Sequence, residues 1–369
     1  MNSKELCLSI LEKANVPINS SEPWSIHIKN EKLWDRITSQ HELGLGESYM
    51  DGWWECKDID HMLTRLLNVD ATTFLTPSPS IIFSALKSRV MNMQTKSKAA
   101  KNAKHHYNIG NDLYTRMLDK EMAYSCGYWK NAQNLDESQV DKFDLICRKL
   151  KLEKGMTILD IGSGWGGLLR HAVKNYGVIA TGISPADQQI LLAREKSAGL
   201  DIQFHQMDYR DFTGKFDRIV SVGMMEHVGP KNFRAFFEKC DELLADDGIM
   251  LHHLISGTRA QIETDGFFNR YIFPGGVIPS PAQITNAAEN LFVLEDVHNF
   301  GLDYDKTLME WFKNINAQWD QIPQYDLRFK RMWNYYLLAS AAGFRSRKLN
   351  LNQYVFRRGG ILEPYIPVR

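Results

Sequence analysis

From about Leu150 onward, short apolar runs alternate with longer stretches whose apolar residues recur at helical spacing. The helical stretches include Asp187–Ser197 and Lys231–Leu244. Strands that alternate with helices in this way form a parallel sheet with helices on both faces, so the pattern predicts a doubly wound α/β domain. The apolar runs place the expected strands at Thr157–Ile161, Val178–Gly182, Ile202–His205, Phe216–Ser221 and Gly248–His252.

The amino-terminal part of the chain has a different pattern, with short helical stretches interrupted by turn signals as far as about Phe74. Val16–Asn19 and Leu43–Gly46 are the clearest of these expected turns. The aromatic segment Glu47–Trp54 is interpreted as core packing of a small helical domain, because buried aromatic rings dominate small cores.

Between Asp70 and Asp112 the chain carries no acidic residue. Basic residues close to an apolar helical stretch are typical of segments attracted to anionic membranes, at about 1 kcal/mol per well-placed charge. A solvated linker between domains explains the same pattern, and the two interpretations are compatible. The basic residues are Lys87, Arg89, Lys96, Lys98, Lys101 and Lys104, preceded by apolar Ile81, Ile82, Phe83, Leu86, Val90 and Met91.

These patterns predict a mainly helical amino-terminal domain, with lipid binding as its expected role, a basic linker and a catalytic domain. At 369 residues the chain is long enough for one large and one smaller domain. The expected boundaries are residues 1–80, 81–105 and 106–369.

Composition narrows the class of protein. Lys and Arg number 44, as do Asp and Glu, and this balance argues against nucleic acid as a partner. Neither a signal peptide nor an apolar run of membrane-spanning length is seen, so we expect a cytoplasmic enzyme that contacts membranes peripherally at their inner face. The cysteines are odd in number and lack CxxC spacing, which favours reduced thiols over disulfides or a zinc site. They are Cys7, Cys56, Cys126, Cys147 and Cys240.

A glycine-rich turn follows the first expected strand, with the spacing Asp-x-Gly-x-Gly-x-Gly. Glycine allows the backbone to turn tightly and a ligand to approach closely. A dinucleotide site needs G-x-G-x-x-G with an acidic residue about 20 positions later, and here Trp165 breaks that phase. The pattern instead resembles the first motif of class I methyltransferases, which implies that the turn lies against the amino acid part of S-adenosylmethionine. Its residues are Asp160, Ile161, Gly162, Ser163, Gly164, Trp165, Gly166 and Gly167.

The loops after the next two expected strands extend this cofactor site. A cofactor that lies across the carboxyl ends of a doubly wound sheet meets these loops. Ser184, Asp187 and Gln189 are candidates for the ribose hydroxyls. Asp208 suits the adenine amino group, and Tyr209 can pack on the adenine ring.

A second cluster of candidate chemistry follows the fourth and fifth expected strands. Glu226 lies beside apolar methionines, which suggests a proton-transferring group in an apolar cavity. Of His252 and His253 only one can face the site, because side chains alternate across a strand. Metal binding by these residues with His227 is a competing interpretation, but the spacing offers no clear third ligand, so no metal is expected. A purely structural histidine also remains open.

Two aromatic segments, Met122–Trp129 and His298–Tyr304, suit a long apolar substrate or a cation stabilised over ring faces, and they equally suit an ordinary core. A helix is expected after the second, running through Trp311 and Trp319.

Together these stretches resemble the cyclopropane-fatty-acyl-phospholipid synthases. The resemblance implies a Rossmann-like class I methyltransferase domain joined to a smaller, mainly helical domain that the shorter mycolic-acid relatives lack. It covers nearly the whole chain, so it is specific. The matching stretches are Leu43–Glu55, His106–Asp112, Tyr124–Cys126, Asp160–Gly167, Phe216–Asn232 and His298–Tyr304.

The resemblance implies that the methyl group of S-adenosylmethionine attacks a cis alkene of an unsaturated acyl chain in membrane phospholipid. A carbocation forms, a base removes a proton from the new methyl, and a cyclopropane ring closes. In the family that base is a bound bicarbonate, held at the matching positions by the side chains of Glu226, His253 and Tyr304 and by the backbone near Cys126 and Ile255. Tyr124 and Ser125 join the cofactor contacts.

Two positions depart from the family pattern. Ser163 stands in the turn where the family commonly has Cys, an isosteric change. Ser340 aligns with a common Cys on a late helix, which argues against a nucleophilic role for that position. Family members are often dimeric, so a homodimer is a further expectation. Methylation of an acyl chain without ring closure, methylation of a small amine, and non-catalytic lipid binding are the remaining alternatives.

Overall fold

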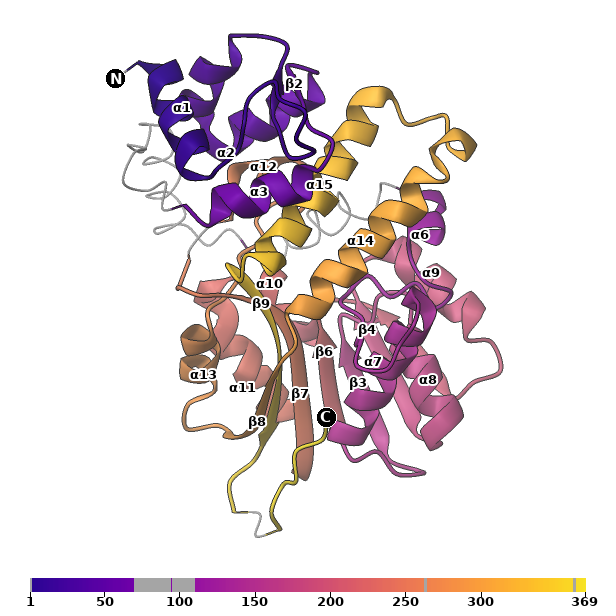
Figure 1. Cartoon of the computed structure of the whole chain (residues 1–369). Coiled ribbons are helices and arrows are strands. Elements are labelled where there is room, and N and C mark those ends of the chain that lie inside the picture. Colours follow the sequence, from indigo (N-terminus) through magenta and orange to yellow (C-terminus); the bar gives the residue numbers. More distant parts are fainter. Residues whose placement is uncertain (1, 70–93, 95–109, 262–263, 361–362) are drawn as a thin grey trace.

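The computed structural model describes residues 2–69, 94, 110–261, 264–360 and 363–369. A helical lobe made from the amino-terminal segment lies at one end of the molecule and an α/β domain at the other (Figure 1). The expected basic linker, apart from Gln94, and His106–Ile109 of the matched stretches lie outside the described residues.

A seven-stranded sheet forms the centre of the α/β domain, in the order β5-β4-β3-β6-β7-β9-β8. Neighbouring strands are parallel from β5 to β7. The pairs β7–β9 and β9–β8 are antiparallel. The strands are β3 (Thr157–Ile161), β4 (Ile179–Ser184), β5 (Ile202–Gln206), β6 (Phe216–Val222), β7 (Leu244–Gly257), β8 (Val293–Asn299) and β9 (Leu349–Arg357).

The doubly wound α/β class is confirmed, and the five predicted strands are parallel; the sequence analysis did not predict β8 and β9, which join one edge of the sheet antiparallel. β9 carries polar Asn350 and Asn352 between its apolar residues, and β8 leaves Val293 and Val297 largely exposed at the edge, so neither is a continuous apolar run. β7 is longer than expected because β9 pairs with it from Ile249 to Gly257. The β3 prediction matches the observed bounds, and the other parallel strands differ by one or two residues.

Alternation along the strands sends apolar side chains into two separate layers. On one face, Ile158 packs with residues of α7 (Leu135–Lys149), α8 (Gly167–Tyr176) and α9 (Asp187–Lys196). On the other, Leu159 packs with residues of α11 (Phe233–Leu243) and α13 (Pro281–Ala288). The helix expected over Lys231–Leu244 is observed as α11, which begins two residues later, after a short 3-10 turn.

The amino-terminal lobe contains α1 (Ser3–Lys13), α2 (Leu33–Met50) and α3 (Ile59–Leu67), with a two-stranded ribbon of β1 (His27–Ile28) and β2 (Trp54–Glu55). The turn expected at Leu43–Gly46 is wrong, because this segment continues α2 beyond a kink at His41. Gly46 serves close packing instead: a Cβ there would lie 2.3 Å from the Phe267 ring. The glycine therefore lets α12 (Gly266–Tyr271) approach α2 closely.

Two long helices, α14 (Leu302–Asn316) and α15 (Leu327–Arg345), run between the lobe and the sheet (Figure 1). Trp54 of the lobe packs against Tyr335 of α15, and one apolar cluster extends through both regions. The helix expected to pass through Trp319 ends at Asn316, and Trp319 begins a separate 3-10 turn. The domain boundaries themselves stay a prediction.

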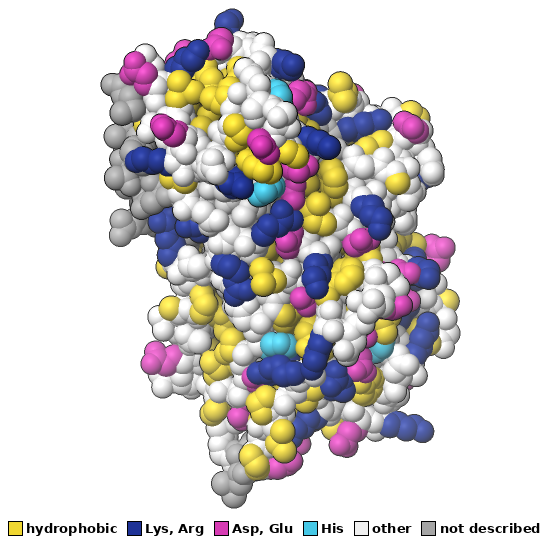
Figure 2. Space-filling model, viewed as in Figure 1, with side chains coloured by type: hydrophobic (Ala, Val, Ile, Leu, Met, Phe, Trp, Pro, Cys, Tyr) yellow, Lys and Arg dark blue, Asp and Glu magenta, His cyan; other side chains and the backbone are white. Residues whose placement is uncertain are grey.

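The surface is mixed in charge on the face shown in Figure 2, where Lys and Arg side chains lie among Asp and Glu side chains. Every cysteine of the chain has a free thiol. Within the described ranges, no helix combines the length and apolarity that a bilayer crossing demands.

Candidate active site

The glycine turn joins β3 to α8 with three glycines in the left-handed region of φ. Gly162, Gly164 and Gly166 have φ values of 91°, 52° and 77°, which other residues adopt at a cost. At Gly166 a Cβ would also come within 2.6 Å of the Phe204 ring. Backbone conformation therefore favours glycine at all three positions, and at Gly166 the space beside Phe204 requires it as well.

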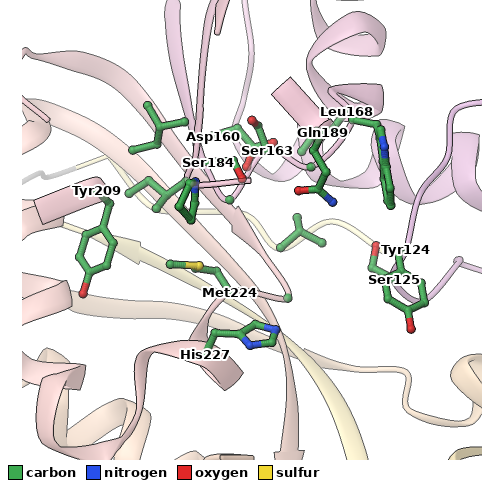
Figure 3. Close-up of a pocket in the computed structure, with 18 of the residues that line it drawn as sticks. Tyr124, Ser125, Asp160, Ser163, Leu168, Ser184, Gln189, Tyr209, Met224 and His227 are labelled. Carbon is green, nitrogen blue, oxygen red and sulfur yellow. The ribbon is translucent and has the colours of Figure 1, made fainter. Parts of the chain in front are cut away.

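A cavity lies beside this turn, at the carboxyl ends of the parallel strands (Figure 3). Tyr124 and Ser125 lie at one end of the view and Tyr209 at the other, with Asp160 and Ser184 between them. All cofactor candidates named from the sequence line the cavity except Gly166 and Asp187. The lining candidates are Tyr124, Ser125, Asp160, Ile161, Gly162, Ser163, Gly164, Trp165, Gly167, Ser184, Gln189, Asp208 and Tyr209.

Asp160 brings an unpaired carboxylate to this cavity. Its Oδ1 atom is buried without a hydrogen-bond partner in the described structure, and the same holds for Ser163 Oγ. Burial raises the pKa of Asp160 to about 7, and the positive charge of Lys142 opposes that shift. A buried acceptor of this kind is costly unless a donor reaches it. The ammonium group of S-adenosylmethionine is a donor that fits.

The far end of the cavity offers a paired rather than an open carboxylate. Asp208 Oδ2 lies 2.6 Å from Arg210 Nη2, and Asp208 Oδ1 accepts from the Arg210 backbone. The Tyr209 ring packs edge-on against Phe236 at 5.0 Å. Both residues border the cavity, so their expected contacts with adenine stay predictions.

Glu226 belongs to α10 (Met225–Val228), directly after β6. Its Oε1 accepts a hydrogen bond from the Ile255 backbone N–H at 2.7 Å. Its Oε2 is buried and has no partner among the described residues. Burial raises the pKa of Glu226 to about 7, and the Ile255 hydrogen bond acts in the opposite direction. The carboxyl is therefore poised near neutrality with one oxygen available.

The two adjacent histidines of β7 face opposite sides, as strand alternation predicts. His252 packs among Phe236, Phe237 and Phe356 on the α11 side. His253 contacts the Phe300 ring, and its Nδ1 lies 3.3 Å from Gln353 Nε2. With the Gln353 amide in this orientation its nitrogen donates, so Nδ1 accepts and the proton of the neutral ring is on Nε2.

His253 Nε2 is buried with no partner in the described structure, so it is available to donate a hydrogen bond to a ligand. Burial and the nearby charges of Lys142 and Lys149 hold the pKa of His253 well below its usual range. The imidazole is therefore neutral. Across the described ranges, no group of three or more His, Cys, Asp and Glu side chains is arranged to hold a metal ion.

Tyr304, in the first turn of α14, completes this neighbourhood. Burial raises its pKa well above the usual value, and the charges of Tyr336, Cys126 and Glu226 act in the same direction. Cys126 is fully buried and its thiol donates to the Gly127 carbonyl. Glu226, Ile255, Tyr304 and Cys126 thus lie together, and His253 shares the strand face of Ile255.

None of these five residues lines the cofactor cavity, but residues next to Cys126 and Glu226 do, namely Ser125 and His227. The side chains of His227 and of nearby Met224 face into the cavity (Figure 3). The Phe273–Gly275 segment closes the same side, and Gln94 donates to the Gly275 carbonyl. The arrangement places a small enclosed polar cluster next to a larger open cavity.

Sequence reasoning missed three charged residues of the cavity wall, which are Glu121, Arg210 and Lys142 of α7. Of these, Lys142 is the fully buried one. It lies on the buried side of the helix with Gln139, Phe143 and Ile146. The sequence does contain a signal for Lys142: it lies three residues after Gln139 and four before Ile146, so helical periodicity places all three on one face.

The family model for mycolic acid cyclopropane synthetase matches residues 94–354. The chain is 45% identical over 351 residues to the cyclopropane-fatty-acyl-phospholipid synthase of Escherichia coli strain K12, covering 95% of this chain and 92% of that protein. It is 30% identical over 354 residues to the tuberculostearic acid methyltransferase UfaA1 of Mycobacterium tuberculosis, covering 88% and 81%.

Among solved structures, the mycolic acid cyclopropane synthase CmaA1 in complex with SAH and CTAB is similar with a TM-score of 0.67 and 31% identity. The match covers 70% of this chain and 98% of that one. The S-adenosylmethionine prediction is confirmed at the level of the methyltransferase class. By family model, near full-length relative and structure alike, the chain belongs to the mycolic acid cyclopropane synthetase family of S-adenosylmethionine-dependent methyltransferases.

Proposed function

We propose that this enzyme converts the cis double bond of an unsaturated acyl chain in membrane phospholipid into a cyclopropane ring. Similarity to a cyclopropane-fatty-acyl-phospholipid synthase along nearly the whole chain carries the proposal. The enclosed cluster of Glu226, His253 and Tyr304 beside the cofactor cavity supports it. S-adenosylmethionine supplies the methyl group that becomes the ring carbon.

The residues of the cavity wall hold the cofactor in this proposal. The Asp160 carboxylate accepts from its ammonium group, and the Asp160–Gly167 turn allows the backbone close approach. Ser184 and Gln189 face the ribose, and Asp208 and Tyr209 face the adenine. Tyr124 and Ser125 border the opposite end.

The enclosed cluster handles the proton. After methyl transfer to one alkene carbon, the other carbon carries positive charge, and one proton must leave the new methyl before the ring can close. The open atoms Glu226 Oε2 and His253 Nε2 offer an acceptor and a donor in a dry site. With the Tyr304 hydroxyl and the backbone near Cys126 and Ile255, they fit a bicarbonate ion, which would supply the base. Neutral His253 and raised-pKa Glu226 suit a site that must stabilise one small anion.

The decisive experiment uses purified protein, S-adenosylmethionine, bicarbonate and vesicles of an unsaturated phospholipid. Ring closure adds one CH2 to the lipid, removes the olefinic protons and introduces cyclopropane proton signals in the NMR spectrum. Methyl transfer that leaves an alkene favours the alternative chemistry suggested by the tuberculostearic acid methyltransferase relative. An unchanged lipid, with cofactor bound, would contradict the proposal and leave methylation of a small amine and non-catalytic lipid binding as the alternatives.

The division into residues 1–80, 81–105 and 106–369 belongs to the same proposal, with the first part binding lipid and the second docking on anionic membrane. Salt-sensitive binding to anionic vesicles supports that docking, because screening weakens surface attraction. Binding that salt does not affect contradicts it. A homodimer is expected from the family, and analytical ultracentrifugation tests it.

A further inference from the structure

Lys142 is a fully buried cation in the wall of the cofactor cavity. Its Nζ lies 2.8 Å from Ser125 Oγ and 2.5 Å from Gln139 Oε1. An ammonium group has three N–H donors, so these neighbours account for two. Within the described structure, no other group accepts the third. A buried charge normally has its donors satisfied, so the third donor calls for an acceptor in the cavity.

A carboxylate with the opposite need lines the same cavity. Asp160 interacts electrostatically with Lys142, yet no ion pair joins the two side chains. Asp160 Oδ1 remains without a partner among the described residues. A positive and a negative group that face one cavity but stay apart are complementary to a zwitterion, whose ammonium and carboxylate are also held apart.

We infer that Lys142 receives the carboxylate of the amino acid part of S-adenosylmethionine, while Asp160 receives its ammonium group. Ser125 acts with the lysine: its Oγ accepts from Nζ, so its own hydroxyl proton remains a donor for the same carboxylate. Lys142 is thus a cofactor-binding residue, and the inference rests on the proposed cofactor site. Burial lowers the pKa of Lys142 to about 8, which leaves the side chain largely charged at neutral pH.

The competing explanation is a structural lysine that only balances Asp119. That carboxylate accepts backbone N–H groups of Ala123 and Glu121 and feels the Lys142 charge, so it organises the segment leading to Ser125. The two explanations differ in which ligands they affect. A structural role weakens every ligand of the cavity, whereas a carboxylate receptor weakens only ligands that carry a carboxylate.

The test compares three ligands on the full-length protein by isothermal titration calorimetry. S-adenosylhomocysteine has both charged groups, decarboxylated S-adenosylhomocysteine has only the ammonium, and 5′-methylthioadenosine has neither. We expect Lys142→Gln and Lys142→Met to weaken S-adenosylhomocysteine binding about 10- to 100-fold, the scale of a charged hydrogen bond. The affinities of the other two ligands should change less than about threefold, because charged-group interactions are what is removed. Equal losses for all three ligands would overturn the inference.

Lys149→Met is the matched control. Lys149 lies on the same helix, is equally buried and has a pKa lowered to about 8, but it pairs with Asp296 and does not line the cavity. We expect this variant to keep the wild-type ratio of the three affinities even if its stability falls. A ratio that changes as much as in the Lys142 variants would contradict the assignment.

Two further measurements keep the outcomes separate. Lys142→Arg keeps the charge, so it should retain the preference for S-adenosylhomocysteine over the decarboxylated ligand, whereas Lys142→Gln should lose that preference. The opposite result, with the preference lost in Lys142→Arg and kept in Lys142→Gln, would contradict the inference. Circular dichroism identifies variants that do not fold. If Lys142→Met does not fold, the comparison uses Lys142→Gln, which is the milder substitution. If the wild-type protein binds none of the ligands, the proposed cofactor site itself fails, which is a distinct result.

Discussion

The two sides of the active site are built in different ways. The proposed cofactor side consists mainly of short loops that follow β3, β4 and β5, to which Tyr124, Ser125 and Lys142 from the preceding part of the chain are added. The side proposed to handle the proton collects Glu226 from α10, His253 from β7 and Tyr304 from α14. The first side lines an open cavity, and the second is enclosed. In the proposal, binding of the cofactor therefore depends mainly on local turns, whereas the chemistry depends wholly on packing between distant segments.

Each side contains one carboxyl group whose pKa burial raises to about 7, Asp160 on the cofactor side and Glu226 on the other. Their surroundings differ. Asp160 has the positive charge of Lys142 nearby, whereas Glu226 has only backbone N–H donors, including that of Ile255. Because of this difference, Asp160 is suited to binding a cationic group, and Glu226 is suited to a site where a proton is transferred. Variants on the two sides should therefore fail in different ways.

The largest effect is expected from Glu226→Gln. The change keeps the shape and the acceptor for Ile255 but removes the carboxylate, so ring formation should fall at least about 100-fold, as for loss of a proton-transfer group. Affinity for S-adenosylhomocysteine should stay within about threefold, since that residue does not line the cofactor cavity. Lipid mass spectrometry and calorimetry measure the two quantities. An unchanged lipid product in this variant would refute the role of Glu226.

The histidine pair tests the same side with a built-in control. His253→Leu should lower the rate of ring formation about 100-fold, because the open Nε2 donor is lost. His252→Leu should leave the rate unchanged and be neutral or stabilising, since both of its ring nitrogens are buried without described partners among aromatic rings. Rates with unsaturated vesicles and thermal unfolding separate these effects. Equal loss of activity in both variants would mean that the strand, not the Nε2 atom, is responsible.

On the cofactor side, Asp160→Asn should weaken S-adenosylhomocysteine binding about 10- to 100-fold, the scale of a charge-assisted hydrogen bond. At saturating cofactor the rate should change much less than in Glu226→Gln, because the proton-handling cluster is intact. KM for the cofactor and kcat distinguish the two sides. A variant that loses kcat with an unchanged KM would remove the distinction drawn between them.

A smaller effect is expected in the pH dependence of stability. The folded pKa of Glu226, about 7, lies above its ordinary value of 4.5, so the folded state holds this proton more tightly than the unfolded state. Its contribution is therefore complete below pH 4.5 and is lost as the pH rises to about 7. Relative to wild type, Glu226→Gln should gain on the order of 2 kcal/mol in the free energy of unfolding between pH 4.5 and pH 8, allowing for partial exposure.

Urea unfolding of wild type and Glu226→Gln at both ends of this pH range measures the difference. A gap between the two proteins that does not change with pH would show that the Glu226 carboxyl titrates normally in the folded state.

The smallest effect concerns Ser340, which packs in α15 away from the cofactor cavity. Ser340→Cys, which introduces the residue that the family resemblance implies for this position, should change the rate of ring formation by less than about twofold, since volume-conserving swaps are well tolerated. A large increase in rate would reveal a role for a thiol there. Steady-state kinetics with unsaturated vesicles suffice.

Much of the cofactor side could be predicted because its residues follow rules that act within a few positions. Gly162, Gly164 and Gly166 are required by backbone conformation, and the apolar run of β3 ends where the turn begins. Periodicity failed where a residue serves a distant contact. Gly46 suggested a turn, but this glycine is there because α2 packs closely on Phe267. The strand β9 was not predicted, because Asn350 and Asn352 interrupt its apolar residues and its pairing depends on two partner strands.

The sequence by itself therefore determined the parallel core of the sheet and the glycine turn after β3, since local backbone geometry and strand alternation are encoded over short distances. Only the tertiary structure decided that His253 rather than His252 faces Phe300, that Ile255 holds Glu226, and that Lys142 reaches the cavity of Asp160. These are contacts between segments far apart in the chain. They exist because burial of the helices and strands brings those segments together, and no local pattern specifies which charges meet.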